Sequence, residues 1–433
     1  QGNDDRGGPA MRTEEAPRLR EHELRHSVDE SMPGIFLVDP TGLFDAAVFV
    51  PRGLIPVLQH FNGRLTCSEI AEVLSRDFGQ AVTAEAVARV AADLEGRSCL
   101  DDERTRASIE AIRQGFLASA VRPMRHCGPA EYPRDGAACA ARLDALLDER
   151  PVDQKASSAS SVLGLISPHI DLQRGARGYA AAYGALQAAE DSAELFVVFG
   201  TAHRGSDCVL TVTDKSFETP FGVVDVDRDF VHAVGARLDR EVKGATEAWR
   251  RDEYLHRDEH SLEFQVLLTH HVQRQRQRPC RIAPFLTGAL PLGAEREPMV
   301  RSCVSALVEA CRDVGVDKVT LIAGADLSHI GPFFGDSGAV TDKDLDRVRA
   351  MDGALLQHAG ELRSDALQAT IEADGNPSRV CGGTPCWFVT EVVRELGGGA
   401  GELLHYEQAV AEDRSQCVSF AAMSFPRPPS DQA

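Results

Sequence analysis

Residues 31–102 begin with short apolar runs and continue with helical patterns. The runs GIFLVD and AVFVP have the length and composition of strands. In the three segments that follow, apolar residues recur at three- or four-residue spacing, and glycines stand where helices should stop. Thr66 and Thr83 have the positions of helix N-caps, and Glu69 completes a capping box with Thr66. The pattern predicts a small winged-helix-like α+β domain, whose expected core is Leu58, Ile70, Val73, Leu74, Val87, Val90 and Leu94.

The chain on either side of this domain is more polar. Residues 1–30 have no hydrophobic periodicity, and we expect them to form a disordered lead-in. Residues 103–120 have a helical pattern and are predicted to connect the small domain to a second, larger one.

From residue 121 to residue 427, strand-like and helix-like segments alternate. Helical patterns follow several of the strand-like runs, among them an alanine-rich segment after the first. This alternation is typical of an α/β fold with a largely parallel central sheet flanked by helices. The expected strands include residues 162–170, 194–203, 281–290 and 318–329.

Three of these strands end in residues that can bind a metal. His169 follows VLGLISP, His203 follows LFVVFGTA, and Asp326 with His329 follows VTLIAGA. In an open α/β sheet, ligands bind at the carboxyl ends of the strands. A single histidine there could simply hydrogen-bond to the backbone, but the same feature on three strands favours a shared site.

A fourth cluster opens the expected helix at residues 252–271. His256, Glu259, His260 and Glu263 recur at helical spacing, and HRDEH matches the H-x-x-E-H pattern of some zinc proteases. A zinc metallopeptidase built on His256, Glu259 and His260 is therefore an alternative function. The other interpretation of His256 is a solvated, charged helix face.

The segment RVCGGTPCWF contains two cysteines and two adjacent glycines. Gly382 and Gly383 would let the Cys381 thiol approach another group closely. The spacing from Cys381 to Cys386 is not that of a structural zinc site. Cys381 could instead join two histidines in a site with an open position, or either thiol could be buried and inert.

Composition excludes several classes of protein. The 433-residue chain has 46 Lys and Arg against 66 Asp and Glu, a formal net charge of −20, which disfavours nucleic-acid and membrane binding. No apolar run approaches the roughly 18 residues of a spanning helix. The 11 scattered cysteines suit reduced thiols, so a cytoplasmic location is expected.

Several motifs of the larger domain resemble those of the Memo family, which includes the B proteins of AmmeMemoRadiSam systems. The resemblance covers about residues 121–425 and keeps the family's chain order. Its motifs are HCGPAEYP, the PHI at His169, GTAHRG, FETPFGVVDVD, RDEHSLEFQ, GADLSHIG and VCGGTP.

The resemblance implies a fold shared with the class III extradiol dioxygenases, which use non-haem iron. Carried over by motif, the metal ligands fall on His169, His203 and Cys381. The catalytic acid–base groups fall on Asp326 and His329, and Glu259 and His260, which line the same cleft, are further catalytic candidates. The expected cofactor is Fe²⁺, with Cu⁺ or Zn²⁺ as alternatives because a thiolate is a soft ligand. The expected function is a redox or oxygen-handling reaction; a non-catalytic metal-binding or partner-binding scaffold is a further alternative.

The chain departs from the family motifs in ways that concern its substrate. Asp171 and Arg174 replace an apolar or aromatic wall, and Arg204 replaces a second histidine, which suggests an anionic small molecule or peptide. The N-terminal domain resembles PqqD-like winged-helix domains, which clasp peptide substrates; a dimerisation or lid module is the alternative. By family resemblance, the expected partner is a radical-SAM-type enzyme.

Overall fold

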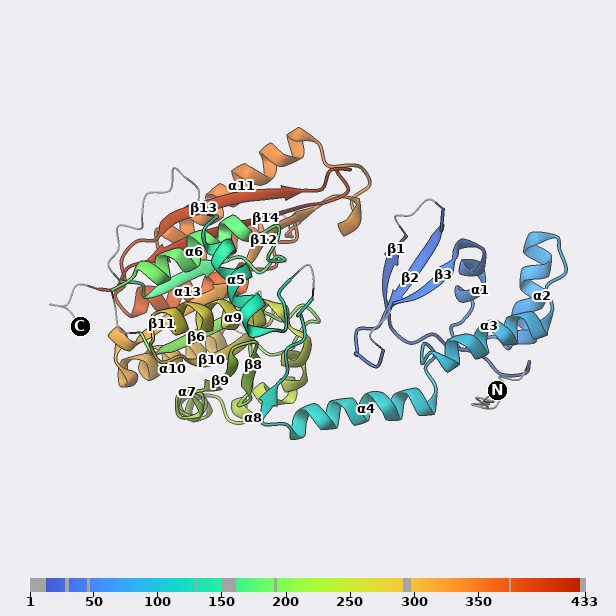
Figure 1. Ribbon diagram of the computed structural model, residues 1–433, viewed down its shortest axis with the longest axis horizontal. Coiled ribbons are helices and arrows are strands. Elements are labelled where there is room, and N and C mark those ends of the chain that lie inside the picture. The colour runs from blue at the N-terminus through green and yellow to red at the C-terminus, as the bar shows by residue number, and fades with distance from the viewer. Residues whose placement is uncertain are drawn as a thin grey trace. The chain divides into compact units, whose positions relative to one another are not determined.

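The computed structural model describes residues 13–27, 31–44, 47–128, 131–149, 161–190, 193–290, 297–373 and 375–428. The chain forms two compact units, Gln1–Ala118 and Ser119–Ala433 (Figure 1). None of the described helices combines the length and apolar character that a membrane span requires.

The described part of the N-terminal unit contains a three-stranded antiparallel sheet and four α-helices. The sheet has the order β1 (Glu23–His26), β2 (Gly34–Val38) and β3 (Val48–Pro51). The turn η1 (Arg52–Leu54) leads into α1 (Ile55–Leu58), α2 (Cys67–Phe78), α3 (Ala84–Gly96) and α4 (Glu103–Ala118). Thr66 and Glu69 form the expected capping box, and Thr83 caps α3.

The expectation of a disordered lead-in is wrong for residues 13–27. Strand β1 pairs with β2, and the N–H of Leu19 donates to the Phe61 carbonyl at 2.8 Å. Arg20 lies 2.6 Å from the carboxylate of Asp39, whose side chain is fully buried. The polar composition of this segment suggested a solvated, disordered chain. In the structure, however, Arg20 pairs with a buried carboxylate rather than with water.

The C-terminal unit is built on one large mixed sheet. Its middle strands β5, β11, β6, β10 and β9 are parallel neighbours, and β14 extends the sheet antiparallel to β5. Every residue of β5 and β11 is buried, as expected for a parallel sheet covered on both faces. The strands are β4 (Val121–Arg122), β5 (Gly164–Ser167), β6 (Leu195–Thr201), β7 (Leu210–Val212), β8 (Ser216–Thr219), β9 (Gly222–Val226), β10 (Arg281–Thr287), β11 (Val319–Gly324), β12 (Asp326–Ile330), β13 (Glu402–Val410) and β14 (Cys417–Phe425).

Helices flank this sheet. The helices α6 and α9 pack against each other and against strands of the sheet, and α13 packs against β5, β6 and β11 and against α10 (Figure 1). This architecture confirms the α/β fold with a largely parallel central sheet. The helices are α5 (Gly136–Leu147), α6 (Ala176–Ala188), α7 (Arg228–Glu241), α8 (Ala245–Arg251), α9 (His260–Gln275), α10 (Glu297–Val314), α11 (Asp342–Gly360), α12 (Ser364–Glu372) and α13 (Gly383–Glu395), with the 3₁₀ turns η2 (Glu253–Asp258), η3 (Val316–Lys318) and η4 (Pro332–Phe334).

Two expected elements are divided in the structure. The run at 318–329 forms β11 and then β12, which leaves β11 and pairs with β14. The run at 252–271 forms η2 and then α9, because Glu259 has an extended backbone (φ −87°, ψ 113°). His256 and His260 therefore do not lie one turn apart on a continuous helix.

Candidate metal centre

The parallel strands β5, β11 and β6 bring three of the expected residues to one edge of the sheet. His169 follows β5, His203 follows β6, and Asp326 follows β11. The ring centroids of His169 and His203 are 4.9 Å apart, and His169 Nε2 lies 3.7 Å from Asp326 Oδ2. The three strand ends thus bring these side chains close together in the structure.

A third imidazole reaches this cluster from the first residue of α9. One ligand nitrogen each of His169, His203 and His260 lies within 4.8 Å of the other two. From the sequence, we expected His260 to serve in catalysis rather than in metal binding. The structure places it where it could be a ligand.

Cys381 supplies a fourth potential donor. Its Sγ lies 3.3 Å from His169 Nε2 and 3.8 Å from the backbone oxygen of Asp326. The next residue must be glycine, because a Cβ on Gly382 would lie 2.4 Å from that same oxygen. The close approach predicted from the glycines is therefore present at Gly382.

Hydrogen bonds orient two of the imidazoles. His169 Nδ1 lies 2.8 Å from the Gly324 carbonyl, and His203 Nδ1 lies 2.9 Å from Glu259 Oε1. Since each acceptor requires a proton on Nδ1, the neutral form of each ring keeps the Nε2 lone pair for a metal. This is the usual arrangement of metal-binding histidines.

Glu259 is a buried carboxylate that holds this part of the site together. It accepts the backbone N–H of His203 at 3.1 Å and that of Ser261 at 3.0 Å, and it lies 3.4 Å from His260 Nδ1. Burial raises the pKa of Glu259, but the His203 hydrogen bond and the nearby imidazoles outweigh it and hold that pKa well below its usual range. Glu259 is therefore ionised at neutral pH.

The protonation states of His169 and His260 suit metal binding. Burial lowers the pKa of His169 well below its usual value and that of His260 to about 4, so both rings are neutral. Burial lowers the pKa of His203 as well, but Glu259 outweighs it and the net shift is upward. Burial and Asp326 raise the pKa of the Cys381 thiol, which is protonated in the metal-free protein.

The two expected acid–base residues have separate surroundings. The Asp326 carboxylate accepts the backbone N–H of His169 at 2.9 Å, and burial raises its pKa to about 7. His329 Nδ1 lies 3.1 Å from the Leu327 carbonyl, and burial lowers its pKa to about 4. Each of these two groups thus has a backbone partner of its own.

His256 is not part of the cluster, and its solvated interpretation is wrong. The side chain is fully buried, and Nε2 lies 3.2 Å from the Thr211 carbonyl. Burial lowers the pKa of His256 to about 3. Because η2 ends before α9 begins, the H-x-x-E-H pattern does not form the two-histidine helix face that a zinc protease needs.

The two arginines that depart from the family motifs both contact carboxylates. Arg174 lies 2.5 Å from Asp171, and Arg204 lies 3.8 Å from Asp258. His126, from the first family motif, adds a fourth ring whose centroid is 5.5 Å from that of His260. Its proximity to the cluster was not foreseen from the sequence.

A cleft of about 460 Å³ opens beside the cluster and has His203 and Cys381 in its wall. His169 is buried and His203 is exposed, so the cluster is accessible from the His203 side. The remaining described lining is mostly uncharged: Thr201, Ala202, Gly205, Thr287, Gly288, Ala289, Leu290, Gln368, Ile371, Glu372, Gly375, Asn376, Val380, Gly383 and Thr384.

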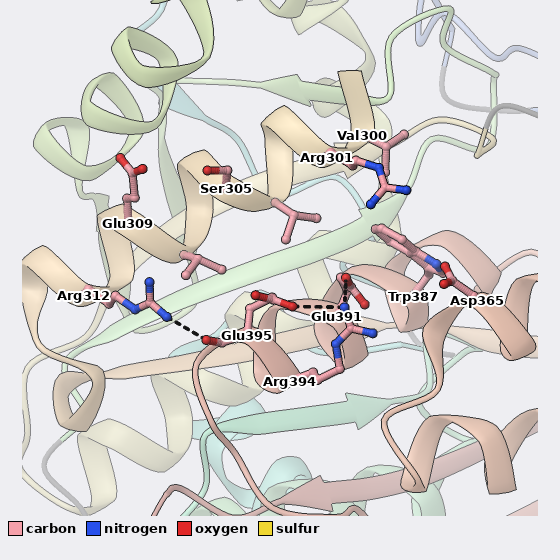
Figure 2. Close-up of a pocket in the computed structure, with 12 residues that line it drawn as sticks. Val300, Arg301, Ser305, Glu309, Arg312, Asp365, Trp387, Glu391, Arg394 and Glu395 are labelled. Atoms are coloured by element: carbon pink, nitrogen blue, oxygen red, sulfur yellow. Dashed lines mark hydrogen bonds and ion pairs between the residues drawn. The ribbon is translucent and has the colours of Figure 1, made fainter. Parts of the chain in front are cut away.

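A second cavity, of about 380 Å³, is lined by α10 and α13 (Figure 2). Arg394 lies 2.5 Å from Glu391 and 3.0 Å from Glu395, and Arg312 donates to the Glu395 carbonyl at 2.8 Å. Among the described residues that line it there is no histidine or cysteine. It therefore lacks the donor types of the histidine cluster.

Comparison with known proteins agrees with the motifs. The family model for "Memo-like protein" matches residues 122–424. The chain belongs to this family. A MEMO1 family protein of Aquifex aeolicus is 22% identical over 94% of this chain and 99% of its own length. A MEMO1 family protein of Thermus thermophilus is 26% identical over 77% of this chain and 91% of its own length. A match over 94% of the chain includes most of the N-terminal unit, so that unit is shared with at least one relative.

Proposed function

We propose that the C-terminal unit binds a single metal ion and uses it in a redox or oxygen-handling reaction. The supporting observation is the meeting of three imidazoles within 4.8 Å, with the Cys381 thiol 3.3 Å from one of them. We propose two possible ligand sets, both of which contain His169 and His203. The third ligand is His260 in one set and Cys381 in the other.

The donor chemistry favours a transition metal. Neutral imidazoles suit iron, copper and zinc, whereas magnesium and calcium prefer oxygen ligands. A thiolate in the third position would favour Cu⁺ or Fe²⁺, and a third imidazole would also suit Zn²⁺. Our proposal is Fe²⁺, with Cu⁺ and Zn²⁺ as the alternatives.

The surrounding residues would support catalysis at such an ion. With three protein ligands a metal keeps positions open for substrate, where it can act as a Lewis acid or redox centre. The cleft beside His203 and Cys381 has the size of a small-molecule site. Asp326 is placed to hold or release a proton next to His169, since its carboxyl contacts that residue.

Metal analysis of anaerobically purified protein tests the proposal directly. We expect one iron or copper per chain in the wild type and loss of the metal in the His169→Ala/His203→Ala double variant. Retention of stoichiometric metal by a folded double variant would refute the assignment.

An oxygen-consumption screen tests the reaction. Metal-dependent oxygen uptake that disappears in the double variant is expected. Bound metal with no turnover of any substrate class would favour the non-catalytic scaffold instead. The anionic nature of the substrate, peptide binding by the N-terminal unit and the radical-SAM-type partner stay predictions.

A further inference from the structure

Arg122 is a fully buried arginine whose hydrogen bonds converge on one short segment. It lies at the end of β4 and is 0% exposed. Its Nε donates to the His256 carbonyl at 2.7 Å, and one Nη donates to the Glu259 carbonyl at 3.2 Å. The other Nη lies 2.5 Å from Glu263 and 3.1 Å from the Pro123 carbonyl.

The segment that Arg122 contacts is the junction between η2 and α9. The break in the helix at Glu259 interrupts the helical hydrogen bonding of the backbone, which leaves carbonyls there in need of a donor. Arg122 supplies two such donors. In this way it fixes the backbone on which Glu259 and His260 stand.

Glu259 and His260 connect this junction to the histidine cluster. Glu259 orients His203 through its Nδ1, and His260 brings the third imidazole. A shift of the junction would therefore move one potential ligand directly and release the orientation of another. Arg122 has no contact of its own with the three imidazoles among the interactions described above.

Glu263, which lies about one turn after His260 on α9, connects this helix to the residues that follow Arg122. It accepts the backbone N–H groups of Arg125 and His126, the latter at 2.8 Å, and the hydroxyl of Tyr132. The Arg122–Glu263 ion pair thus joins α9 to the segment 122–132, and both charges are compensated inside the protein.

We propose that Arg122 is a positioning residue of the metal centre, acting through Glu259 and His260. The proposal rests on the metal-binding function proposed above. The planar guanidinium is essential because it donates in several fixed directions at once. A lysine could neutralise Glu263, but its single nitrogen could not also hold the carbonyls of His256 and Glu259.

The test compares Arg122→Lys with a matched variant at the far end of β11. Arg427 donates to the carbonyls of Val316, in η3, and Val319, the latter at 2.7 Å. Arg427→Lys therefore removes a similar set of guanidinium-to-carbonyl bonds beside a 3₁₀ turn, away from the histidines. Full-length wild type and both variants would be titrated anaerobically with Zn²⁺ and Co²⁺ in competition with a chromophoric chelator.

We expect Arg122→Lys to weaken binding of both ions by about tenfold to a hundredfold, as for other residues that orient metal ligands. The Co²⁺ absorption bands should shift as well, since they report the arrangement of ligands. Arg427→Lys should bind within twofold of wild type with unchanged bands.

Two results would overturn the inference. Wild-type affinity and bands in Arg122→Lys would show that Arg122 does not position the ligands. An equal loss in Arg427→Lys would show that general destabilisation is the cause. If the wild type itself bound neither ion, the metal-binding function would fall and this inference with it. Should Arg122→Lys not fold, Tyr132→Phe, which removes one hydrogen bond to Glu263, gives a milder test with the same expected direction and the same refuting outcome.

Discussion

Replacing Glu259 by glutamine should weaken metal binding by a predictable amount. The carboxylate accepts three N–H groups, from His203 Nδ1 at 2.9 Å, the His203 backbone at 3.1 Å and Ser261 at 3.0 Å. Glutamine offers one oxygen and one NH₂ in their place. In one orientation of the amide, the NH₂ faces the His203 backbone N–H and leaves it unsatisfied. In the other, it faces the ring, whose proton must then move to Nε2, the position proposed to bind metal.

Both orientations have a cost that can be estimated. An unsatisfied buried N–H costs about 1–3 kcal/mol of folding free energy. Loss of a carboxylate that orients a ligating histidine lowers metal affinity about tenfold to a hundredfold, or roughly 1.4–2.8 kcal/mol. We therefore expect Glu259→Gln to lose both stability and metal affinity by amounts of this size.

The stability difference should also depend on pH. The pKa of Glu259 in the folded protein is held below its ordinary value of 4.5, so its ionised form stabilises the fold above that pH. That stabilisation diminishes as the pH falls below 4.5 toward the lower pKa of the folded state. The gap in unfolding free energy between wild type and Glu259→Gln should narrow in acid. It should also narrow as the pH rises through the pKa of His203, which Glu259 raises in the folded protein.

Chelator competition with Zn²⁺ and denaturant unfolding of the metal-free protein would measure the two effects. Glu391→Gln is the matched control, because Glu391 is also a carboxylate with a side-chain N–H donor, Arg394, but lies in the cavity of Figure 2. It should leave metal affinity within twofold of wild type. A folded Glu259→Gln that also binds Zn²⁺ within twofold of wild type would refute the reasoning.

Three further changes distinguish the possible ligands. Metal binding at pH 8 should release one more proton in wild type than in Cys381→Ser, because the raised pKa of Cys381 keeps its thiol protonated until metal binds. Titration with a pH indicator would measure this release. Equal proton release by the two proteins would exclude the Cys381 thiolate as a metal ligand. Cys381→Glu should retain Fe²⁺ and lose any preference for Cu⁺ in competitive loading, since a hard carboxylate replaces a soft donor; unchanged selectivity would contradict this. His256→Ala should keep full metal stoichiometry while losing roughly 0.5–3 kcal/mol of stability, because the ring is buried away from the cluster; loss of the metal from folded protein would favour the peptidase alternative.

The strand ends could be located from the sequence because local and global patterns agree there. The apolar runs before His169 and His203 are long enough to mark buried strands, and parallel strands end at a common edge. The same reasoning placed Asp326 correctly at the end of β11. The division of this run into β11 and β12 could not be predicted, since the strand-like pattern continues without a break through residue 329.

The remaining parts of the centre depend on contacts between distant residues. Arg122 lies 134 residues before His256 in the sequence and 137 before Glu259, and no local pattern links an arginine at the start of a domain to that junction. The break at Glu259 was missed because the spacing of residues 256–263 fits one continuous helix. As a result, the place of His260 among the three clustered imidazoles was missed.

The four potential metal donors, three histidines and Cys381, lie on separate elements. We therefore predict that His260 and Cys381 can each serve as the third ligand when the other is removed. His260 is held at the start of α9 by Glu259 and Arg122, whereas Cys381 precedes α13 and is held where Gly382 approaches Asp326. Because different elements anchor the two residues, removing either donor should leave the other in place.

Three protein ligands are the usual number in catalytic sites. His260→Ala and Cys381→Ser should therefore each retain one metal per chain with reduced affinity, and the double variant should lose it. Metal analysis after gel filtration, with circular dichroism as the check on folding, would measure this. A folded single variant that loses its metal completely would identify the removed side chain as the obligatory third ligand, and the two donors would then not be interchangeable.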